Sequence, residues 1–476
     1  MLVVICLAVV CSFSGCKKQV EILTEYEIFV EYAPENATLA GTVKVSFENG
    51  GENEISTLKF QVYPNAYRKD AVQKPLSTTL QNLAYYAGES YGEMVISSVS
   101  GAKSWEVLGQ DNNVLYVYLE RSLFPGDKVV LDIGFLVKLA SVNHRTGITR
   151  NTVNLANFFP VLCGYQNGGF YECVPCERGD PFYSECADYR VSVTLPKDYL
   201  VAATGEMVDE RTLERKKKYE FTATAVRDFA MVVSARFQRL ETQVGDTQIF
   251  YYYYQDERAQ ATLNTVTECF SYYNDAFGEY PYPTYTVAQT GYCGGSAEYP
   301  CLAFISDTLS ETEKVRAIAR ETANQWWGVA VGNNQMENAW LDEGLAEYSA
   351  ITFFEEHEKY AVLRDDEVSN ALKEYRSFYD VYGSVLGRTD TRMQRDLKDF
   401  ANEYEYRCLV YDKSVIMFDT LRKSVGDKKF FVALKKYYEN NLYAVATSEH
   451  LIASFEKSGL DVRGFFESFL QGKAVL

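Results

Sequence analysis

Alternating hydrophobic and polar positions dominate the first half of the chain. Residues 25–32 and 41–47 alternate with a period of two, and similar runs recur at 114–119 and 189–195. Asn-Gly, Gly-Glu-Asn and Pro-Gly-Asp breaks separate these runs. Such alternation between turn residues is typical of strands with one buried face. The pattern therefore predicts an N-terminal β-sandwich-like domain that ends near residue 238.

The hydrophobic period changes after this point. One further strand is expected at 249–254, a helix at 257–277, and two short strands at 285–289 and 301–306. From residue 311 onward, the hydrophobic positions recur at helical spacing. We therefore expect a second region over 239–476, mixed α/β at first and then entirely helical. Its last helices are expected at 414–425, 428–439, 448–457 and 462–472.

The helix expected at 311–328 has a clear first turn. Ser310 precedes it, and Glu313 follows three residues later. A serine and a glutamate at this spacing can satisfy two of the free backbone amides of a first turn. The sequence therefore predicts where this helix begins, and hence which of its residues share a face.

Four residues in and after this helix occupy the positions of a zinc-peptidase motif. Arg320 and Asn324 lie four residues apart, with Glu321 between them, and Glu343 follows nineteen residues after Asn324. In a zinc peptidase, the helix reads His-Glu-x-x-His: both histidines bind the metal and the glutamate activates its water. Here the glutamates remain and both histidine positions have changed.

The two replacements argue against a metal. Arginine has no acceptor atom and keeps its proton, and asparagine offers only a weak amide oxygen. We therefore expect no zinc here, and expect the Arg320 guanidinium to pair with Glu343 or Glu321; the alternative is that it swings into solvent. The three histidines form no ligand-like pair in the sequence: they are His144, His357 and His450.

Charge and the start of the chain narrow the classes of function. The formal net charge is −18, which argues against nucleic-acid binding. Residues 1–15 are uncharged and largely apolar, and this segment is too short to span a bilayer. It ends with Ser14 and Gly15, and Cys16 follows directly. We interpret them as a lipoprotein-type signal peptide with Cys16 as the lipidated residue. An ordinary signal peptide is the alternative.

Eight cysteines follow the signal. An exported chain permits disulfides, and no histidine lies near the cluster between residues 163 and 186. We therefore expect disulfides or free thiols rather than a structural zinc site, with no pairing deducible from the sequence. The eight are Cys163, Cys173, Cys176, Cys186, Cys269, Cys293, Cys301 and Cys408.

Several stretches together carry a family resemblance. They are Asn157-Phe158-Phe159-Pro160, residues 179–185, Gly278-Glu279-Tyr280-Pro281-Tyr282, Gly294-Gly295-Ser296-Ala297-Glu298-Tyr299-Pro300, residues 340–348 and residues 406–414. With them, the chain resembles the gluzincin zinc aminopeptidases of the alanyl aminopeptidase and leukotriene hydrolase type. The resemblance implies an α+β protein: a β-sandwich-like domain over 16–238, then a thermolysin-like domain over 239–476 that is α/β at first and helical later. No C-terminal cap domain is expected.

The resemblance also implies roles for single residues. Glu321 takes the position of the general base, and Tyr411 that of the tyrosine that stabilises the oxyanion. Glu298 takes the position that binds the substrate amino terminus, with Gly294 and Gly295 before it as substrate-binding residues. Glu343 takes the position of the third metal ligand.

From these observations we expect an exported, lipid-anchored, aminopeptidase-like protein at a bacterial cell surface, non-catalytic or vestigial. Its expected partners are peptides with a free amino terminus, and the membrane through Cys16, but no nucleic acid. The expected cofactor is none, or zinc if the family site still functions. Two alternatives stay open: an active aminopeptidase with an atypical metal site, and a surface scaffold that contacts a partner through tyrosine clusters such as residues 251–254.

Overall fold

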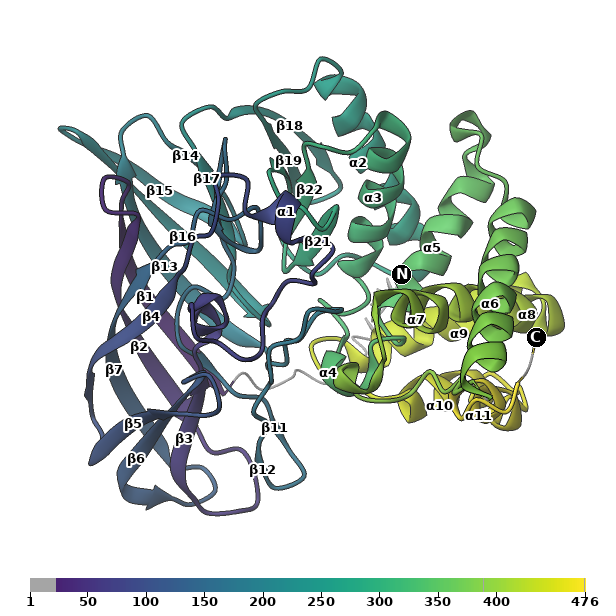
Figure 1. Ribbon diagram of the computed structural model, residues 1–476, viewed down its shortest axis with the longest axis horizontal. Helices are drawn as coiled ribbons and strands as arrows, with labels where there is room; N and C mark the ends of the chain where they lie inside the picture. The colour runs from purple at the N-terminus through teal and green to yellow at the C-terminus, as the bar shows by residue number, and fades with distance from the viewer. Residues whose placement is uncertain (1–22, 388, 475) are drawn as a thin grey trace, which may run out of the picture.

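The computed structural model describes residues 23–387, 389–474 and 476. The signal segment and Cys16 lie outside these residues. A β-rich half, built from the first part of the chain, lies beside a second half in which a smaller sheet is followed by helices on its far side (Figure 1). The fold is therefore α+β, as the sequence predicts.

A seven-stranded sheet forms the outer layer of the β half (Figure 1). Its pairs are antiparallel except for the parallel contact between its first strand and the strand that begins at Ala187. In β1, Tyr26, Ile28 and Val30 are buried and alternate with more exposed residues, as period two requires. In spatial order the strands are β15 (Glu206–Leu213), β16 (Lys216–Val226), β13 (Ala187–Pro196), β1 (Thr24–Ala33), β2 (Thr38–Glu48), β7 (Lys128–Lys138) and β4 (Glu93–Ser100).

Smaller sheets cover its inner face. Leu58 and Phe60 of one of them belong to the same buried cluster as Ile28 and Val43 of the large sheet, so the two layers share a core. That sheet contains β10 (Val161–Leu162), β3 (Ile55–Gln61), β6 (Val114–Leu123) and β5 (Ser104–Leu108). A second contains β14 (Leu200–Ala203), β17 (Met231–Ser234), β9 (Val153–Leu155) and β8 (Thr146–Ile148). The remaining elements are the short helix α1 (Gln81–Ala84) and the hairpin of β11 (Tyr165–Gln166) and β12 (Gly169–Phe170).

A five-stranded sheet begins the second half. Its order is β18 (Gln238–Val244), β19 (Thr247–Tyr253), β20 (Thr284–Thr290), β22 (Leu302–Ser306) and β21 (Ser296–Tyr299). The last of these strands is antiparallel to its neighbour and forms the edge of the sheet. The helices α2 (Ala259–Phe277) and α3 (Glu311–Asn324) contact this sheet.

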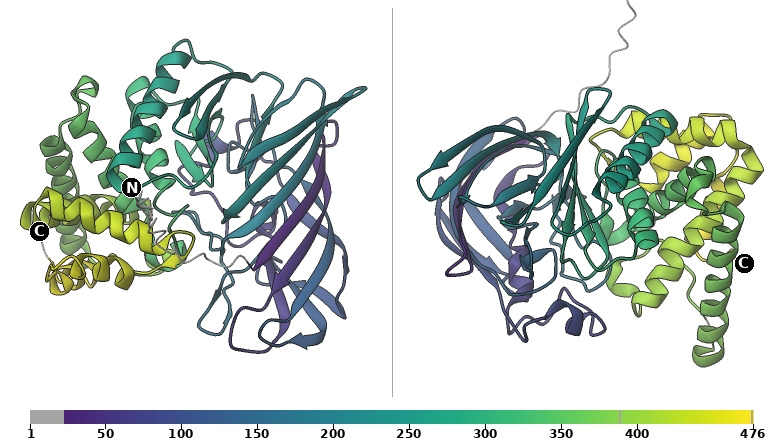
Figure 2. Two further views of the ribbon diagram at one scale, coloured as in Figure 1. Left: turned by 180° about the vertical axis from the view of Figure 1, so that it is seen from behind. Right: turned by 90° about the horizontal axis from the view of Figure 1, so that it is seen from above.

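Helices dominate the rest of the chain (Figures 1 and 2). This part is not entirely helical, contrary to the expectation, because the short strands β23 (Gly332–Asn333) and β24 (Val445–Ala446) form a parallel pair. The helices are α4 (Gln335–Asn338), α5 (Glu343–Glu356), α6 (Arg364–Leu386), α7 (Glu403–Arg407), α8 (Lys413–Val425), α9 (Asp427–Asn441), α10 (Ser448–Glu456) and α11 (Arg463–Leu470). The last four long helices expected from the sequence are therefore present, with ends shifted by a few residues. Among the described residues, no helix combines the length and the apolar character needed to cross a membrane.

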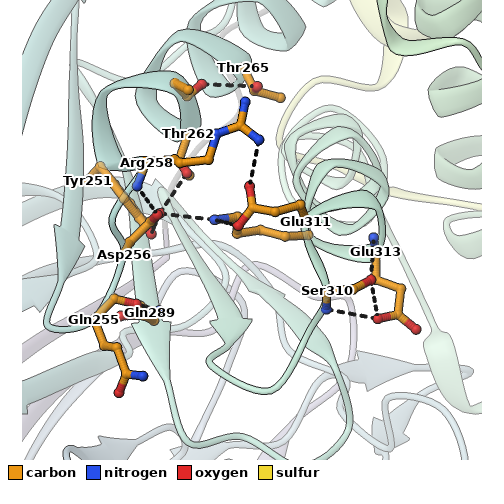
Figure 3. A network of polar contacts seen from close by, with 12 residues as sticks. Tyr251, Gln255, Asp256, Arg258, Thr262, Thr265, Gln289, Ser310, Glu311 and Glu313 are labelled. Carbon is orange, nitrogen blue, oxygen red and sulfur yellow. Dashed lines mark hydrogen bonds and ion pairs between the residues drawn. The ribbon is translucent and has the colours of Figure 1, made fainter.

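Polar contacts fix the starts of α2 and α3 (Figure 3). The predicted capping pair is present: the Ser310 hydroxyl accepts from the Glu313 amide, and the Glu313 carboxylate accepts from the Ser310 amide. The buried Asp256 carboxylate accepts from Tyr251 and Thr262 and pairs with Lys314 at 3.1 Å. These contacts hold the first turns of both helices against the sheet.

The end of α3 differs from the prediction. The helix ends at Asn324 rather than near Gly328. The next turn widens, because the amide of Val329 donates to the carbonyl of Asn324 across five residues. Trp326 and Trp327 lie in this turn and are completely buried. Packing of these two rings therefore takes precedence over the regular helical spacing that the sequence suggested.

A buried arginine joins the two halves. Arg227 follows β16, and its guanidinium donates to the carbonyl of Val329 at 3.0 Å, to that of Ala444, and to that of Ser184. One side chain from the β half thus satisfies backbone acceptors of the helical half. This contact fixes the relative position of the loops that line the cavity described below. All eight cysteines of the described residues are free thiols, so neither a disulfide nor a cysteine metal site forms there.

Candidate functional site

A cavity of about 370 Å³ lies where the two halves meet. The β half contributes the segment 175–182 and the residues around Arg145, and the second half contributes β21, α3, α5, α7 and the turn before α8. Five of the residues singled out in the sequence line it: Gly294, Glu298, Arg320, Glu343 and Tyr411. The structure therefore brings residues from four separate motifs to one place.

Arg320 is the central residue of this site. Its Nη2 lies 2.7 Å from Oε1 of Glu321, and its Nη1 lies 3.2 Å from Oε2 of Glu343. The same guanidinium donates to the hydroxyl of Ser296 at 3.0 Å and to that of Tyr411 at 3.3 Å. The expected pairing is confirmed, and Arg320 pairs with both glutamates rather than with one. Its side chain does not swing into solvent, because only 21% of it is exposed.

Glu321 is fully engaged by its neighbours. It is completely buried, and it accepts hydrogen bonds from the Ser296 hydroxyl at 2.6 Å and the Asn324 amide at 3.2 Å, besides its ion pair with Arg320. A general base needs an oxygen that can receive a proton from water. Here both carboxylate oxygens already accept from protein groups, so Glu321 is poorly placed to receive a proton from water.

The residues at the ligand positions do not fit zinc. Zinc takes imidazole, thiolate or carboxylate donors. Arg320 presents N–H groups, and Asn324 directs its amide nitrogen to Glu321 and leaves its buried Oδ1 without a partner among the described residues. The remaining carboxylate, Glu343, is paired with the guanidinium. A cation would have to approach Arg320 directly, which charge repulsion opposes.

Glu343 stands at the N-terminus of α5, next to a second buried acid. Asp342 accepts from the side-chain amides of Gln335 at 2.7 Å and Asn333 at 3.0 Å. Burial raises the pKa of Asp342 to about 7. Burial also raises the pKa of Glu343 well above its usual range; the Arg320 charge opposes this effect, and nearby carboxylates add to it.

Glu298 lies on the edge strand β21, and its carboxylate has few hydrogen-bond partners. Its one hydrogen bond in the described part of the chain comes from the Gln335 amide, at 3.4 Å. Burial, together with the charges of Asp180, Glu343 and Glu321, raises its pKa well above the usual range. An incompletely paired carboxylate that lines a cavity is a good acceptor for a cationic ligand group.

One acidic residue of this group, Asp180, was not predicted from the sequence. One carboxylate oxygen from each of Asp180, Glu298 and Glu343 lies within 4.8 Å of the others. Asp180 comes from the β half, where it forms an ion pair with Arg145, which in turn donates to the Tyr299 hydroxyl at 3.1 Å. The only signal in the sequence was the stretch 179–185, which supported the family resemblance without assigning a role to Asp180.

Two tyrosines line the cavity beside these acids. Tyr411 lies in a π-helical turn, Cys408–Asp412, which interrupts the run from α7 into α8, and π-helical turns often occur at functional sites. Burial raises the pKa of Tyr411, so its hydroxyl stays protonated. The Tyr406 hydroxyl is buried and has no hydrogen-bond partner among the described residues.

A second cavity of about 230 Å³ lies on the other side of Arg320. It shares Gly294, Ser296 and Arg320 with the first cavity, and Gly295 also lines it. Gly294 therefore borders both cavities, and Gly295 borders the second. A side chain at Gly294 would meet the Tyr292 ring, whereas the space beside Gly295 is open, so a ligand can approach the backbone there.

We predict that Arg320→Met destabilises the fold. The change leaves Glu321 and Glu343 buried without their shared cation, and breaking a buried pair in this way costs about 3 kcal/mol. Arg316→Met is the control: its partner Glu367 lies nearer the surface, so we expect a loss of about 1 kcal/mol or less. Chemical denaturation measures both. Equal losses for the two variants would contradict a structural role for Arg320.

We also predict that the protein becomes more stable as the pH falls from 8 to 6.5. Burial raises the pKa of Asp228, Asp342 and Asp412 to about 7 each, so the folded state binds protons in this range that the unfolded state does not. The summed gain is about 2 kcal/mol. Below pH 6.5 the gain is opposed, because burial lowers the pKa of His144 to about 3 and only the unfolded state then protonates it.

Denaturation curves at several pH values test this prediction. Asp412→Asn should reduce the dependence on pH, and Asp427→Asn should not, because hydrogen bonding to Arg422 lowers the pKa of Asp427. Stability that rises between pH 6.5 and 8 would contradict the prediction.

Comparisons with known proteins agree with this geometry. Residues 261–469 match the peptidase family M1 domain. The chain is 24% identical to aminopeptidase N of Lactococcus lactis subsp. lactis over 44% of the chain and 26% of that protein. It is 24% identical to leukotriene A-4 hydrolase of Xenopus laevis over 40% of the chain and 32% of that protein. The chain thus spans about a quarter to a third of the length of these two relatives.

Solved structures show the same fold over nearly the whole chain. The M1 zinc metallopeptidase from Deinococcus radiodurans superposes with a TM-score of 0.63 at 18% identity, covering 96% of this chain and 95% of that one. A mutant of that protein, crystallised with a Tyr-Ser-Ala substrate, superposes with a TM-score of 0.62 at 18% identity and the same coverage. These structures show the shared fold. Residues 261–469 match the peptidase family M1 domain, and with the two sequence relatives this match supports the assignment of the chain to the gluzincin aminopeptidases.

Proposed function

We propose that this protein binds the amino termini of peptides in its cleft without metal-dependent hydrolysis. The observation that carries the proposal is the Arg320 guanidinium, which bridges Glu321 and Glu343 where the family motif would bring zinc ligands together. This bridge leaves Glu321 without a free oxygen, yet it leaves Glu298 and the cavity open to a ligand.

The carboxylate spacing suits a primary ammonium. Three N–H donors at tetrahedral angles, each about 2.9 Å from an oxygen, place their three acceptors about 4.7 Å apart. The oxygens of Asp180, Glu298 and Glu343 lie within 4.8 Å of one another. An amino terminus can therefore donate one hydrogen bond to each carboxylate.

The local charge favours one positive charge over a divalent cation. Asp180 pairs with Arg145, and Glu343 shares Arg320 with Glu321, so Glu298 and one charge of the Glu321–Glu343 pair stay uncompensated. An ammonium balances one of these two charges, and the raised pKa of Glu298 and of Glu343 lets a proton neutralise the other. A divalent ion would sit close to two guanidinium groups as well, and their repulsion reduces its affinity.

The edge strand supplies a place for the peptide backbone. β21 is the last strand of its sheet, so its outer backbone groups are available for pairing with an extended peptide. Gly294 and Gly295 precede it; Gly294 borders both cavities, and Gly295 borders the second. A peptide held by its amino terminus at Glu298 can run along this edge.

Neither alternative has a specific observation in its favour. Peptide hydrolysis needs an activated water, and the groups that could activate it are Arg320, which is a cation, and Glu321, which is already bonded. For a scaffold that uses surface tyrosines, Tyr251, Tyr252 and Tyr254 are buried instead of exposed. Export, a lipid anchor at Cys16 and a place at the bacterial cell surface remain part of the proposal, based on residues 1–18 alone.

We predict that the protein binds norleucyl-Ala-Ala at least about 10-fold more tightly than the N-acetylated form of this peptide. Acetylation removes the positive charge of the amino terminus, and we expect that charge to contribute about 1.4 kcal/mol or more to the binding free energy. Isothermal titration calorimetry measures both affinities. Glu298→Gln should weaken binding of the free peptide and leave the acetylated peptide unchanged. The exposed Glu467→Gln serves as the control and should bind like the parent. Equal or absent binding of both peptides would contradict the proposal.

A further inference from the structure

The mouth of the main cavity carries a second, separate acidic group. Glu177 and Glu403 both line the cavity and are exposed at its opening. They come from the two halves of the molecule: Glu177 precedes Asp180 in the segment from the β half, and Glu403 is the first residue of α7. The cavity therefore has acids both at its base and at its entrance.

Glu403 is the uncompensated member of this pair. Glu177 pairs with Arg178 at 2.9 Å. The Glu403 carboxylate makes no hydrogen bond or ion pair with any residue that the structure describes. Burial of part of the side chain raises its pKa, and the nearby charge of Arg178 lowers it. The entrance therefore keeps a negative charge that a ligand could balance.

A buried hydroxyl connects the entrance with the base of the cavity. Tyr406 lies three residues after Glu403 on α7, so both side chains are on one face of the helix. Tyr406 is 1% exposed, and its hydroxyl has no partner among the described residues. The charges of Glu343, Asp180 and Glu403 all act on it. Tyr406 lines the same cavity as both acidic groups, and its hydroxyl has a hydrogen bond still to make.

We propose that the cavity selects peptides whose first residue is basic, lysine or arginine. In this arrangement, the α-ammonium group binds Asp180, Glu298 and Glu343, and the side-chain cation binds Glu403 at the entrance. The inference rests on the proposed function, since it requires the amino terminus to be held at the base. Acidic first residues are repelled by the same carboxylates.

The remaining cavity wall suits the aliphatic part of such a side chain. Phe182 and Tyr292 line the cavity, and both rings already face the Arg145 guanidinium, at 5.4 and 5.5 Å. Aromatic faces pack well against the methylene groups of lysine and arginine and attract their charge. A cavity of about 370 Å³ also has room for a long side chain.

The test compares two peptides that differ only in the side-chain charge. Isothermal titration calorimetry of the full chain is performed with Lys-Ala-Ala and with norleucyl-Ala-Ala. We expect the parent to bind the lysine peptide about 10-fold more tightly, with the difference falling as salt is added. Glu403→Gln should remove this preference and leave the affinity for the norleucine peptide within about 2-fold.

The control is Asp399→Asn. Asp399 is an exposed acid close to Glu403 in the sequence, but it does not line the cavity, so the preference should remain. Equal affinities of the parent for the two peptides would overturn this inference and leave the proposed function intact. A Glu403→Gln variant that weakens both peptides alike would also overturn it. No binding of either peptide would overturn the proposed function and this inference together.

Discussion

The ion pairs of Arg320 with Glu321 and Glu343 are the interaction on which the site depends. Two like charges about 4 Å apart cost about 4 kcal/mol at an effective dielectric constant near 20, and burial adds to this cost. A fold that retains both glutamates without a metal needs another cation between them. Arg320 is that cation, and it stands one helical turn from Asn324 on α3. A position that binds metal in the family motif here carries the compensating charge itself.

The charge around the cavity nevertheless stays negative. Two guanidinium groups, those of Arg145 and Arg320, face a larger set of buried or half-buried carboxylates. Burial, together with the charges of neighbouring carboxylates, raises the pKa of Glu298, Asp342 and Glu343, and protonation of these groups is one way to relieve the excess. Binding of a cationic ligand is another. The imbalance therefore accounts for the proposed affinity for amino termini, and Asp342 contributes to the expected gain of stability toward lower pH. The carboxylates are Asp180, Glu298, Glu321, Asp342 and Glu343.

Local patterns in the sequence predicted a large part of this structure. The alternation of residues 25–32 gives a strand with one buried face, and the capping pair at Ser310 starts α3 where expected. The positions of Arg320 and Glu321 on that helix allowed the ion pairing of Arg320 to be predicted from the sequence. These features depend on neighbours a few residues away, which is why periodicity and capping rules find them.

Other features depend on contacts between distant parts of the chain. Asp180 joins Glu298 only because Arg145 and the loops of the β half hold it over the cavity. The π-helical turn that carries Tyr411, and the early end of α3, follow from packing of large side chains rather than from local spacing. The unpartnered hydroxyl of Tyr406 has no signature in the sequence at all.

The most direct test of the account is the zinc content of the purified protein, measured by elemental analysis beside the variant that combines Arg320→His and Asn324→His. We predict that the parent carries no stoichiometric zinc, because Arg320 supplies a cation where a ligand would be needed. The double variant should bind one zinc per chain, because Glu343 would complete a three-residue ligand set. Stoichiometric zinc in the parent protein would contradict the account.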